Sequence, residues 1–469
     1  SRPADDNPWF NPVPKHAFNV GFDMNHESPA THYYFSRIVE HWLQEYRIDG
    51  FRFDLSKGFT QNATCDANGN NCNVGTWGNV DNSRIAIWKK YYDTVQLKSP
   101  GAYAILEHFA ANEEEKILSD YGMLLWGNMN HSFSEASMGN IGGSGSNFDG
   151  GLHTVRGWTN PYLVTYMESH DEERMAYRNI QSGRVSGNYN IRDTSTSLRR
   201  IEMSAAFLMT MPGPKMIWQF GELGYDYSIN YCINNGTIND GCRTGNKPIR
   251  LDYRSQERRK RLYDVYASLA QLKFHGWYKD VFTANNITID HSLNGGFKWM
   301  RLRSATDSSQ LLIVGNFDVN PSSGTITFPT AGTWYDYLNG NTITAVSGGQ
   351  TIALQPGEYH IYLNRNLSNA VTTPVTNVPG AVELLKASML PNPADASSVV
   401  DLELPMGGRV QVQLLNAEGK ELGMIFNGTL AKGRHRLPAG SQMNNLSPGL
   451  YLLKVIAVNK QVSVKVLVK

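Results

Sequence analysis

Helical and strand-like hydrophobic patterns alternate along the chain between about residues 30 and 276. The segment HYYFSRIVEHWLQEY places Phe35, Val39 and Leu43 on one face at helical spacing. The strand-like run IDGFRFDL follows it, and similar pairs recur downstream. This alternation predicts βα units and a parallel sheet. The predicted strands lie near residues 48–54, 102–107, 123–126, 162–168 and 215–219.

Five strands are fewer than the eight of a closed (β/α)8 barrel. A barrel would need three further strands upstream of Ser1, whereas an open doubly wound sheet needs no more than five. The chain begins in a polar, proline-rich stretch, SRPADDNPWFNPVP, which is typical of the middle of a domain. The motifs described below favour the barrel. We therefore expect an upstream segment of the same protein, a partial α/β barrel over residues 1–276, and residues 1–30 as the end of an inserted loop domain.

The pattern changes after residue 276. Short alternating strands separated by Gly, Pro and Asn turns predict an all-β sandwich over residues 277–364. Residues 365–384 are rich in Thr, Pro, Asn and Val without a period, as expected of a linker. A second small β-sandwich module is predicted for residues 385–469.

Composition narrows the functional classes only a little. The formal net charge of +1 over 469 residues argues against a nucleic-acid partner, which normally requires a basic excess. No run of 18 apolar residues occurs, so no membrane span is predicted. Aromatic residues make up 11% of the chain and fit either packed cores or sugar stacking.

The four cysteines form two close pairs, Cys65 with Cys72 and Cys232 with Cys242. Each pair brackets a polar loop rich in Gly and Asn, which favours disulfides and an oxidising compartment. Free thiols or a four-cysteine zinc site are the alternatives, although neither pair has the tight spacing of zinc ligands. The run Asp66, Asn68, Asn70 has some features of a calcium loop but lacks its closing acidic residue, so we interpret it as a turn.

Charged residues end three of the predicted strands. In FRFD, Arg52 and Asp54 share one face because side chains two apart in a strand point the same way. Such a pair at the carboxyl end of a strand lies where barrel active sites form, and the arginine would keep the carboxylate ionised and oriented. A structural salt bridge is the alternative for this segment alone.

Two later strands end in the same way. Glu107 closes the apolar run AYAILE, where burial would raise its pKa and suit a general acid. His170 and Asp171 end YLVTYMESHD. Three strand-end carboxylates in βα units exceed what packing requires, and paired carboxyl groups are what glycoside hydrolysis needs.

These segments resemble three of the four signature regions of the α-amylase family, family 13 of the glycoside hydrolases. GFRFDLSKG is similar to the nucleophile region, ILEHF to the acid/base region and MESHD to the region of the transition-state aspartate. MPGPKMIWQFGELG is similar to the last barrel strand of the family. The resemblance implies that Asp54 is the nucleophile, Glu107 the general acid/base and Asp171 the residue that stabilises the distorted substrate.

The same resemblance implies three supporting roles. Arg52 would orient the nucleophile, His170 would bind sugar hydroxyls and Lys57 would line an acceptor subsite.

The sequence departs from the family pattern in two places. The first signature region, D-x-x-x-N-H, is absent, and FDMNH at 22–26 is similar to it only superficially. Gly58 stands where many members have histidine. A structural Ca²⁺ is expected by resemblance, with a backbone oxygen near Gly58 as one possible ligand, but no metal-binding side chain is identified and no organic cofactor is expected.

The C-terminal module has its own resemblance. MLPNPA at 389–394, NLSPGLYLLKV at 445–455 and the closing KVLVK are similar to the sorting domain of the type IX secretion system. This implies recognition by that secretion machinery and a secreted or cell-surface protein of a Bacteroidetes bacterium. An adhesive or glycan-binding β-sandwich is the alternative.

The leading hypothesis is a retaining, endo-acting hydrolase of α-1,4-glucosidic bonds in starch, glycogen or related α-glucans. A transglycosylase or debranching enzyme would use the same three carboxylates. An inactive or glucan-binding fragment is the alternative of another class, because the first barrel strands are absent from the chain.

Overall fold

The computed structural model describes residues 3–306, 308–367, 385–404, 407–444, 446–457 and 460–468. The chain divides into two compact units, Ser1–Thr376 and Asn377–Lys469. Most of the predicted linker, residues 368–384, lies outside the described residues, and the predicted domain boundaries stay predictions. None of the helices in the described ranges is long and apolar enough to cross a membrane.

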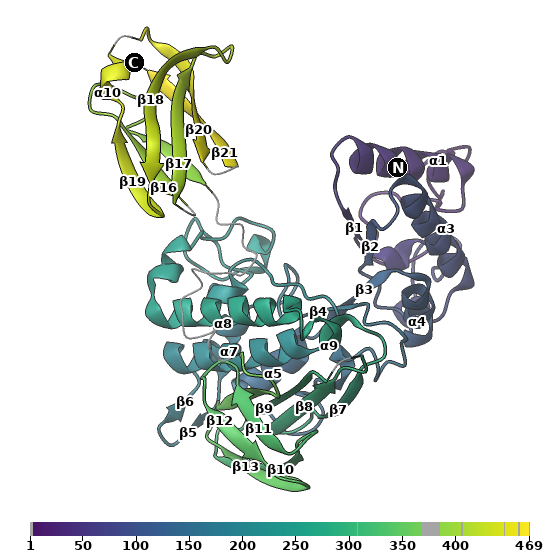
Figure 1. The fold of residues 1–469 in the computed structure, drawn as a ribbon. Helices are drawn as coiled ribbons and strands as arrows, with labels where there is room; N and C mark the ends of the chain where they lie inside the picture. The colour runs from purple at the N-terminus through teal and green to yellow at the C-terminus, as the bar shows by residue number, and fades with distance from the viewer. Residues whose placement is uncertain are drawn as a thin grey trace. The chain divides into compact units, whose positions relative to one another are not determined.

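The first unit begins with a parallel four-stranded sheet in the order β1-β2-β3-β4 (Figure 1). Helices connect the strands, as the alternating pattern predicted. The strands are β1 (Gly50–Phe53), β2 (Tyr103–Leu106), β3 (Leu124–Asn128) and β4 (Leu163–Tyr166), and the helices up to β4 are α1 (Pro29–Gln44), α2 (Val74–Trp77), α3 (Asn82–Lys98), α4 (Asn112–Tyr121) and α5 (Asn130–Met138).

Local sequence accounts for the helix that precedes β1. The Ser28 hydroxyl caps α1 by accepting a hydrogen bond from the Ala30 N–H, and Pro29 occupies the first turn, where its missing N–H costs nothing. Val39 and Leu43 are buried, and Phe35 packs against Phe53 at 5.9 Å between ring centroids. The apolar face of α1 thus covers the sheet beside the strand that carries Arg52.

The fifth predicted strand, near residues 215–219, is reduced to one parallel bridge between Lys215 and Thr165. The Met216 N–H donates to the Thr165 carbonyl at 3.1 Å, and the Lys215 ammonium donates to the carbonyls of Pro212, Gly213 and Pro214. The described residues therefore contain four barrel strands where about five were expected.

The rest of the first unit combines helices with a β-sandwich. A six-stranded antiparallel sheet has the order β12-β11-β14-β9-β8-β7, and β10 pairs with β13. The elements are α6 (Met175–Ser182), β5 (Val185–Ser186), β6 (Tyr189–Asn190), α7 (Thr194–Thr210), α8 (Glu257–Phe274), α9 (Lys279–Thr283), β7 (Thr288–Ser292), β8 (Phe297–Arg303), β9 (Gln310–Asn316), β10 (Ser322–Thr327), β11 (Gly332–Asp336), β12 (Thr342–Ala345), β13 (Gly349–Leu354) and β14 (Tyr359–Leu363).

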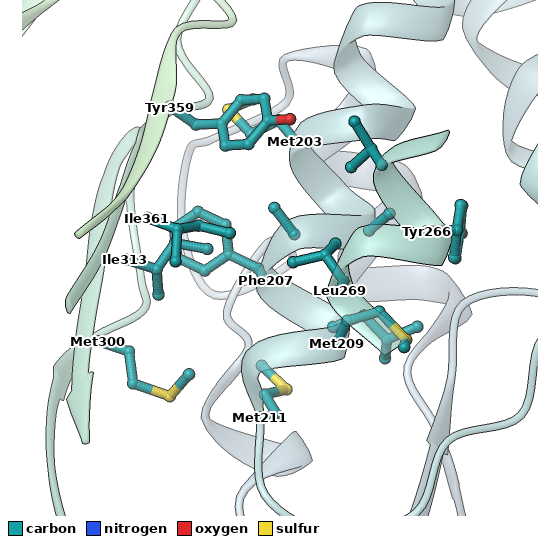
Figure 2. Packing of buried hydrophobic residues seen from close by; sticks show 14 of the residues in the cluster. Met203, Phe207, Met209, Met211, Tyr266, Leu269, Met300, Ile313, Tyr359 and Ile361 are labelled. Atoms are coloured by element: carbon teal, nitrogen blue, oxygen red, sulfur yellow. The ribbon is translucent and has the colours of Figure 1, made fainter. Parts of the chain in front are cut away.

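A continuous hydrophobic core joins this sheet to the helices. Figure 2 shows Phe207 of α7 beside Ile313 and Ile361 of the sheet, and Met203 of α7 beside Tyr359. Arg200 of α7, which is fully buried, donates to the carbonyls of Ala136 and Phe317, among others. Apolar packing and this hydrogen-bonded arginine fix the sandwich against the helical layer.

The second unit is a small β-sandwich of its own. One sheet has the order β15-β16-β19 and the other β18-β17-β20-β21. Buried Val, Leu, Met and Ala side chains fill the space between the two sheets. The elements are β15 (Lys386–Leu390), β16 (Val399–Leu404), β17 (Gly408–Leu415), β18 (Glu421–Leu430), β19 (Gly433–Pro438), α10 (Gly440–Met443), β20 (Gly449–Ala457) and β21 (Lys460–Val468).

Candidate active site

The predicted catalytic segments leave the parallel sheet at its carboxyl edge. Asp54 directly follows β1 and Glu107 directly follows β2. The Glu107 N–H donates to the Phe53 carbonyl, and the Glu107 carbonyl accepts from the Ser56 N–H, both at 3.0 Å. Backbone pairing of the two strands therefore brings the first two predicted carboxylates side by side.

Arg52 joins these carboxylates. Its guanidinium lies 2.5 Å from Asp54 Oδ1 and 2.7 Å from Glu107 Oε2. It also covers the indole ring of Trp126 on β3, at 4.2 Å from the ring centroid. One cation thus contacts both predicted catalytic groups, and the shared face of the strand predicted its contact with Asp54.

The two carboxylates lie in different environments. The Asp54 side chain is 75% exposed, whereas that of Glu107 is 13% exposed. Burial raises the pKa of Glu107, and the Asp54 charge adds to this effect, against the opposing Leu55 N–H hydrogen bond and the Arg52 charge. An accessible carboxylate beside one with a raised pKa is the arrangement that a nucleophile and a general acid require. Their separation, expected at about 5–5.5 Å for a retaining enzyme, stays a prediction.

His170 and Asp171 come from the loop after β4, and the His170 ring lies beside the same tryptophan. The His170 ring is 6.3 Å from Trp126 and 5.7 Å from Trp218, between ring centroids. Its Nε2 lies 3.3 Å from Asp171 Oδ2. Trp126 therefore lies beside both Arg52 and His170.

Tyr166, at the end of β4, is influenced by the charges of both Glu107 and Asp171. Burial raises its pKa, and the negative charges of Glu172, Glu107 and Asp171 raise it further. The charges of Glu107 and Asp171 therefore both act on this buried phenol, and Arg52 joins Asp54 to Glu107.

Lys57 lies on the short 3₁₀ turn Ser56–Gly58. Its ammonium donates to the Phe109 carbonyl at 3.1 Å and sits 4.4 Å from the centre of the Trp77 ring. Burial lowers its pKa, as does the nearby Arg84 charge. The side chain is thus tied to the segment after Glu107.

A cleft of about 740 Å³ opens beside His170. Its wall includes aromatic side chains that the sequence patterns did not single out, together with Arg243 from a distant loop. These aromatic residues are Trp218, Phe220, Tyr225 and Tyr227. Flat aromatic faces beside polar donors suit stacking against sugar rings.

A comparison with protein families shows which family the chain belongs to. Residues 15–259, slightly more than half of the chain, match the family described as "Alpha amylase, catalytic domain". The chain belongs to the α-amylase family. Residues 388–469 match the "Secretion system C-terminal sorting domain", so the predicted sorting domain is confirmed and the protein is secreted or displayed at the cell surface.

Solved structures confirm the α-amylase fold. An Anoxybacillus alpha-amylase is 16% identical, with 76% of this chain and 71% of that chain covered and a TM-score of 0.51. AmyP in complex with maltose is 15% identical, with 78% and 73% covered and a TM-score of 0.54. A type I pullulanase from Bacillus subtilis, complexed with maltose, is 15% identical, with 76% and 50% covered and a TM-score of 0.51. No curated protein matched the chain.

The structure explains how the chain accommodates Gly58 where many α-amylases have histidine. A Cβ atom at Gly58 would lie 2.8 Å from two ring atoms of His16. The His16 ring stacks on Trp77 with 5.0 Å between centroids and lies 3.4 Å from Asp23. An imidazole from the N-terminal segment thus occupies the space that a side chain at position 58 would need.

Two places bear on the expected Ca²⁺, the Gly58 carbonyl and the turn that begins at Asp66. The Gly58 carbonyl accepts from the Thr60 N–H at 2.9 Å. Both Asp66 oxygens accept hydrogen bonds within their own turn, from Asn68, Asn70 and Asn71. In the ranges that the structure describes, no three His, Cys, Asp or Glu side chains are grouped to hold a metal ion. No catalytic step is assigned to a metal ion, and the expected structural Ca²⁺ stays a prediction.

Both predicted disulfides are formed, between Cys65 and Cys72 and between Cys232 and Cys242. The Cys65–Cys72 bridge closes the turn around Asp66. The Cys232–Cys242 bridge closes a loop directly before Arg243.

Proposed function

We propose that this α-amylase family member is a retaining, endo-acting hydrolase of α-1,4-glucosidic bonds in starch, glycogen or related α-glucans. The observation that carries the proposal is the Arg52 bridge between an exposed Asp54 and a largely buried Glu107 with a raised pKa. Relatives of the same fold bind maltose, as their descriptions state.

In the proposed mechanism, Glu107 protonates the glycosidic oxygen while Asp54 Oδ attacks the anomeric carbon. The bond to the leaving chain breaks and a covalent glycosyl–Asp54 ester forms. Glu107, now ionised, then takes a proton from water, whose oxygen attacks the same carbon and releases Asp54. The buried side chain favours the protonated Glu107 that the first step requires.

Asp171 and His170 are proposed to bind hydroxyl groups of the sugar undergoing reaction. Their side chains are 45% and 44% exposed, so both are accessible from the site opening. Hydrogen bonds that strengthen as the ring flattens would lower the barrier more than they tighten substrate binding. Lys57 is proposed to contact the departing chain.

Product analysis distinguishes endo-hydrolysis from its alternatives. Soluble starch should yield a spread of maltooligosaccharides early in the reaction, with pullulan left largely uncut. Maltotriose released from pullulan would indicate a debranching enzyme, which the fold shared with a type I pullulanase makes the second candidate. Products longer than a maltotetraose substrate would indicate a transglycosylase, and either result would contradict the proposed specificity.

The C-terminal sorting domain is proposed to direct export by the type IX machinery of a Bacteroidetes bacterium. The two disulfides in the first unit are consistent with an oxidising destination. A structural calcium ion and an upstream segment of the same protein stay predictions.

A further inference from the structure

A disulfide-closed loop reaches across 72 residues of sequence to touch a predicted catalytic aspartate. Arg243 donates through Nη2 to the Asp171 backbone carbonyl at 2.6 Å and to Asp171 Oδ1 at 3.1 Å. These contacts fix both the main chain and the side chain at position 171. No sequence motif pointed to Arg243.

The loop that presents Arg243 is closed at its base. The Cys232–Cys242 bridge ends one residue before Arg243. The Asn239 side chain caps the short turn Asp240–Cys242 by accepting from the Gly241 N–H. The cross-link restrains the backbone of this turn, so less loop entropy is lost when Arg243 binds its partner.

The C-terminal side of the loop is fixed by a second cation. The Lys247 ammonium donates to the carbonyls of Cys242 and Gly245, each at 2.7 Å. The Lys247 ammonium therefore donates its hydrogen bonds to the backbone of the loop. Arg243 is the cation of this loop that reaches the aspartate.

Each oxygen of the Asp171 carboxylate thereby has a neighbouring nitrogen. Arg243 binds Oδ1, and His170 Nε2 lies 3.3 Å from Oδ2. The side chains of Arg243 and Asp171 are 46% and 45% exposed, and Arg243 and His170 both line the 740 Å³ cleft. The aspartate remains accessible to a sugar while its rotation is restricted.

We propose that Arg243 is a positioning residue for Asp171, and that the Cys232–Cys242 disulfide holds Arg243 in place. The inference rests on the proposed function, because it assumes that Asp171 binds the sugar at the transition state. Arg243 acts through Asp171. Misplacing a catalytic group by about 1 Å can cost on the order of 100-fold in rate.

Substitution of Arg243 in the full-length protein tests the first part. R243Q should lower kcat on soluble starch by roughly 10- to 100-fold with little change in KM, because an interaction realised in the transition state is lost. R243K should restore part of the rate, since a lysine ammonium still offers a charged donor to Oδ1 but lacks the planar fork of arginine. A purely structural role would instead give equal losses in both variants together with a lowered Tm.

The two disulfides offer a matched comparison for the second part. C232S/C242S should reproduce most of the R243Q loss in kcat, and adding R243Q to it should cost little more. C65S/C72S removes a bridge of similar loop length elsewhere and should leave kcat near that of the wild type. Equal kcat in wild type and C232S/C242S would overturn the role of the disulfide.

The outcomes separate this inference from the proposed function. Normal kcat in R243Q, with activity abolished in E107Q, would overturn the role of Arg243 and leave the proposed function standing. Full activity in E107Q would overturn the proposed function itself.

Discussion

Replacing Glu107 with glutamine is expected to lower kcat for α-1,4-glucan hydrolysis by about 10³-fold, within the range typical of general acid–base catalysis. The amide keeps the shape of the side chain and can still accept the Leu55 N–H hydrogen bond, found at 2.9 Å. It cannot protonate the leaving oxygen. The measurement is steady-state hydrolysis of soluble starch by the full-length protein, with Tm recorded alongside.

Glu45→Gln provides the matched control for this loss. Glu45 is exposed at the end of α1, where the same change should leave both kcat and Tm unaltered. E107Q with near-normal kcat would show that Glu107 is not the general acid.

Removing Glu114 is expected to destabilise the first unit by about 3–5 kcal/mol, the usual cost of leaving a buried charge without its partner. The Glu114 carboxylate lies 2.5 Å from Arg84 Nε and 2.8 Å from His108 Nε2, and these side chains are at most 1% exposed. E114A would leave the Arg84 guanidinium buried without its main counter-charge. Urea unfolding monitored by circular dichroism measures the loss.

The same network supports the segment after Asp54. Arg84 also donates to the Lys57 carbonyl at 3.2 Å, and His108 Nδ1 lies 2.9 Å from Ser56 Oγ. E114A should therefore lower activity as well as stability. Glu113→Ala, on the exposed side of the same helix, should change neither by a measurable amount, and an equal loss in both variants would contradict this account.

The pH dependence of this stabilisation follows from the pKa of Glu114. Burial alone would raise it, but the hydrogen bonds and charges of His108 and Arg84 lower it on balance below 4.5. A carboxyl group whose pKa is lower in the folded protein stabilises the fold fully at pH values above its pKa in the unfolded chain. This stabilisation is lost as the pH falls through its pKa in the folded protein. The difference in free energy of unfolding between wild type and E114A should therefore become smaller below about pH 4.

Local sequence patterns were sufficient to predict which charged residues lie at the strand ends. The two-residue period of a strand placed Arg52 and Asp54 on one face, and parallel pairing of β1 with β2 then made Glu107 their neighbour. The cysteine pairs were equally predictable, because each spans a short polar loop whose ends meet in a turn.

Contacts between distant segments could not be derived in this way. Arg243 meets Asp171 through a loop 72 residues downstream. His16 fills the space beside Gly58 from an N-terminal segment without a helical or strand period. Trp126 was visible only as an apolar strand residue, although its spacing from Leu124 and Asn128 put it on a definite face of β3.

The strand predicted near 215–219 is present only as the parallel bridge between Lys215 and Thr165, with one backbone hydrogen bond donated by Met216 to Thr165. MPGPKMIW is apolar enough for a buried strand, but an apolar pattern does not show how far ladder pairing continues.

The most direct measurement of the central claim is identification of the residue that becomes covalently glycosylated. A maltosyl fluoride reacts without acid assistance because fluoride is a good leaving group, so E107Q should form the intermediate and, lacking its general base, hydrolyse it slowly. Digestion and mass spectrometry should then find the maltosyl group on Asp54, within the peptide that contains GFRFDLSK. A label on any other residue, or rapid turnover with no labelled peptide, would contradict a retaining mechanism centred on Asp54 and Glu107.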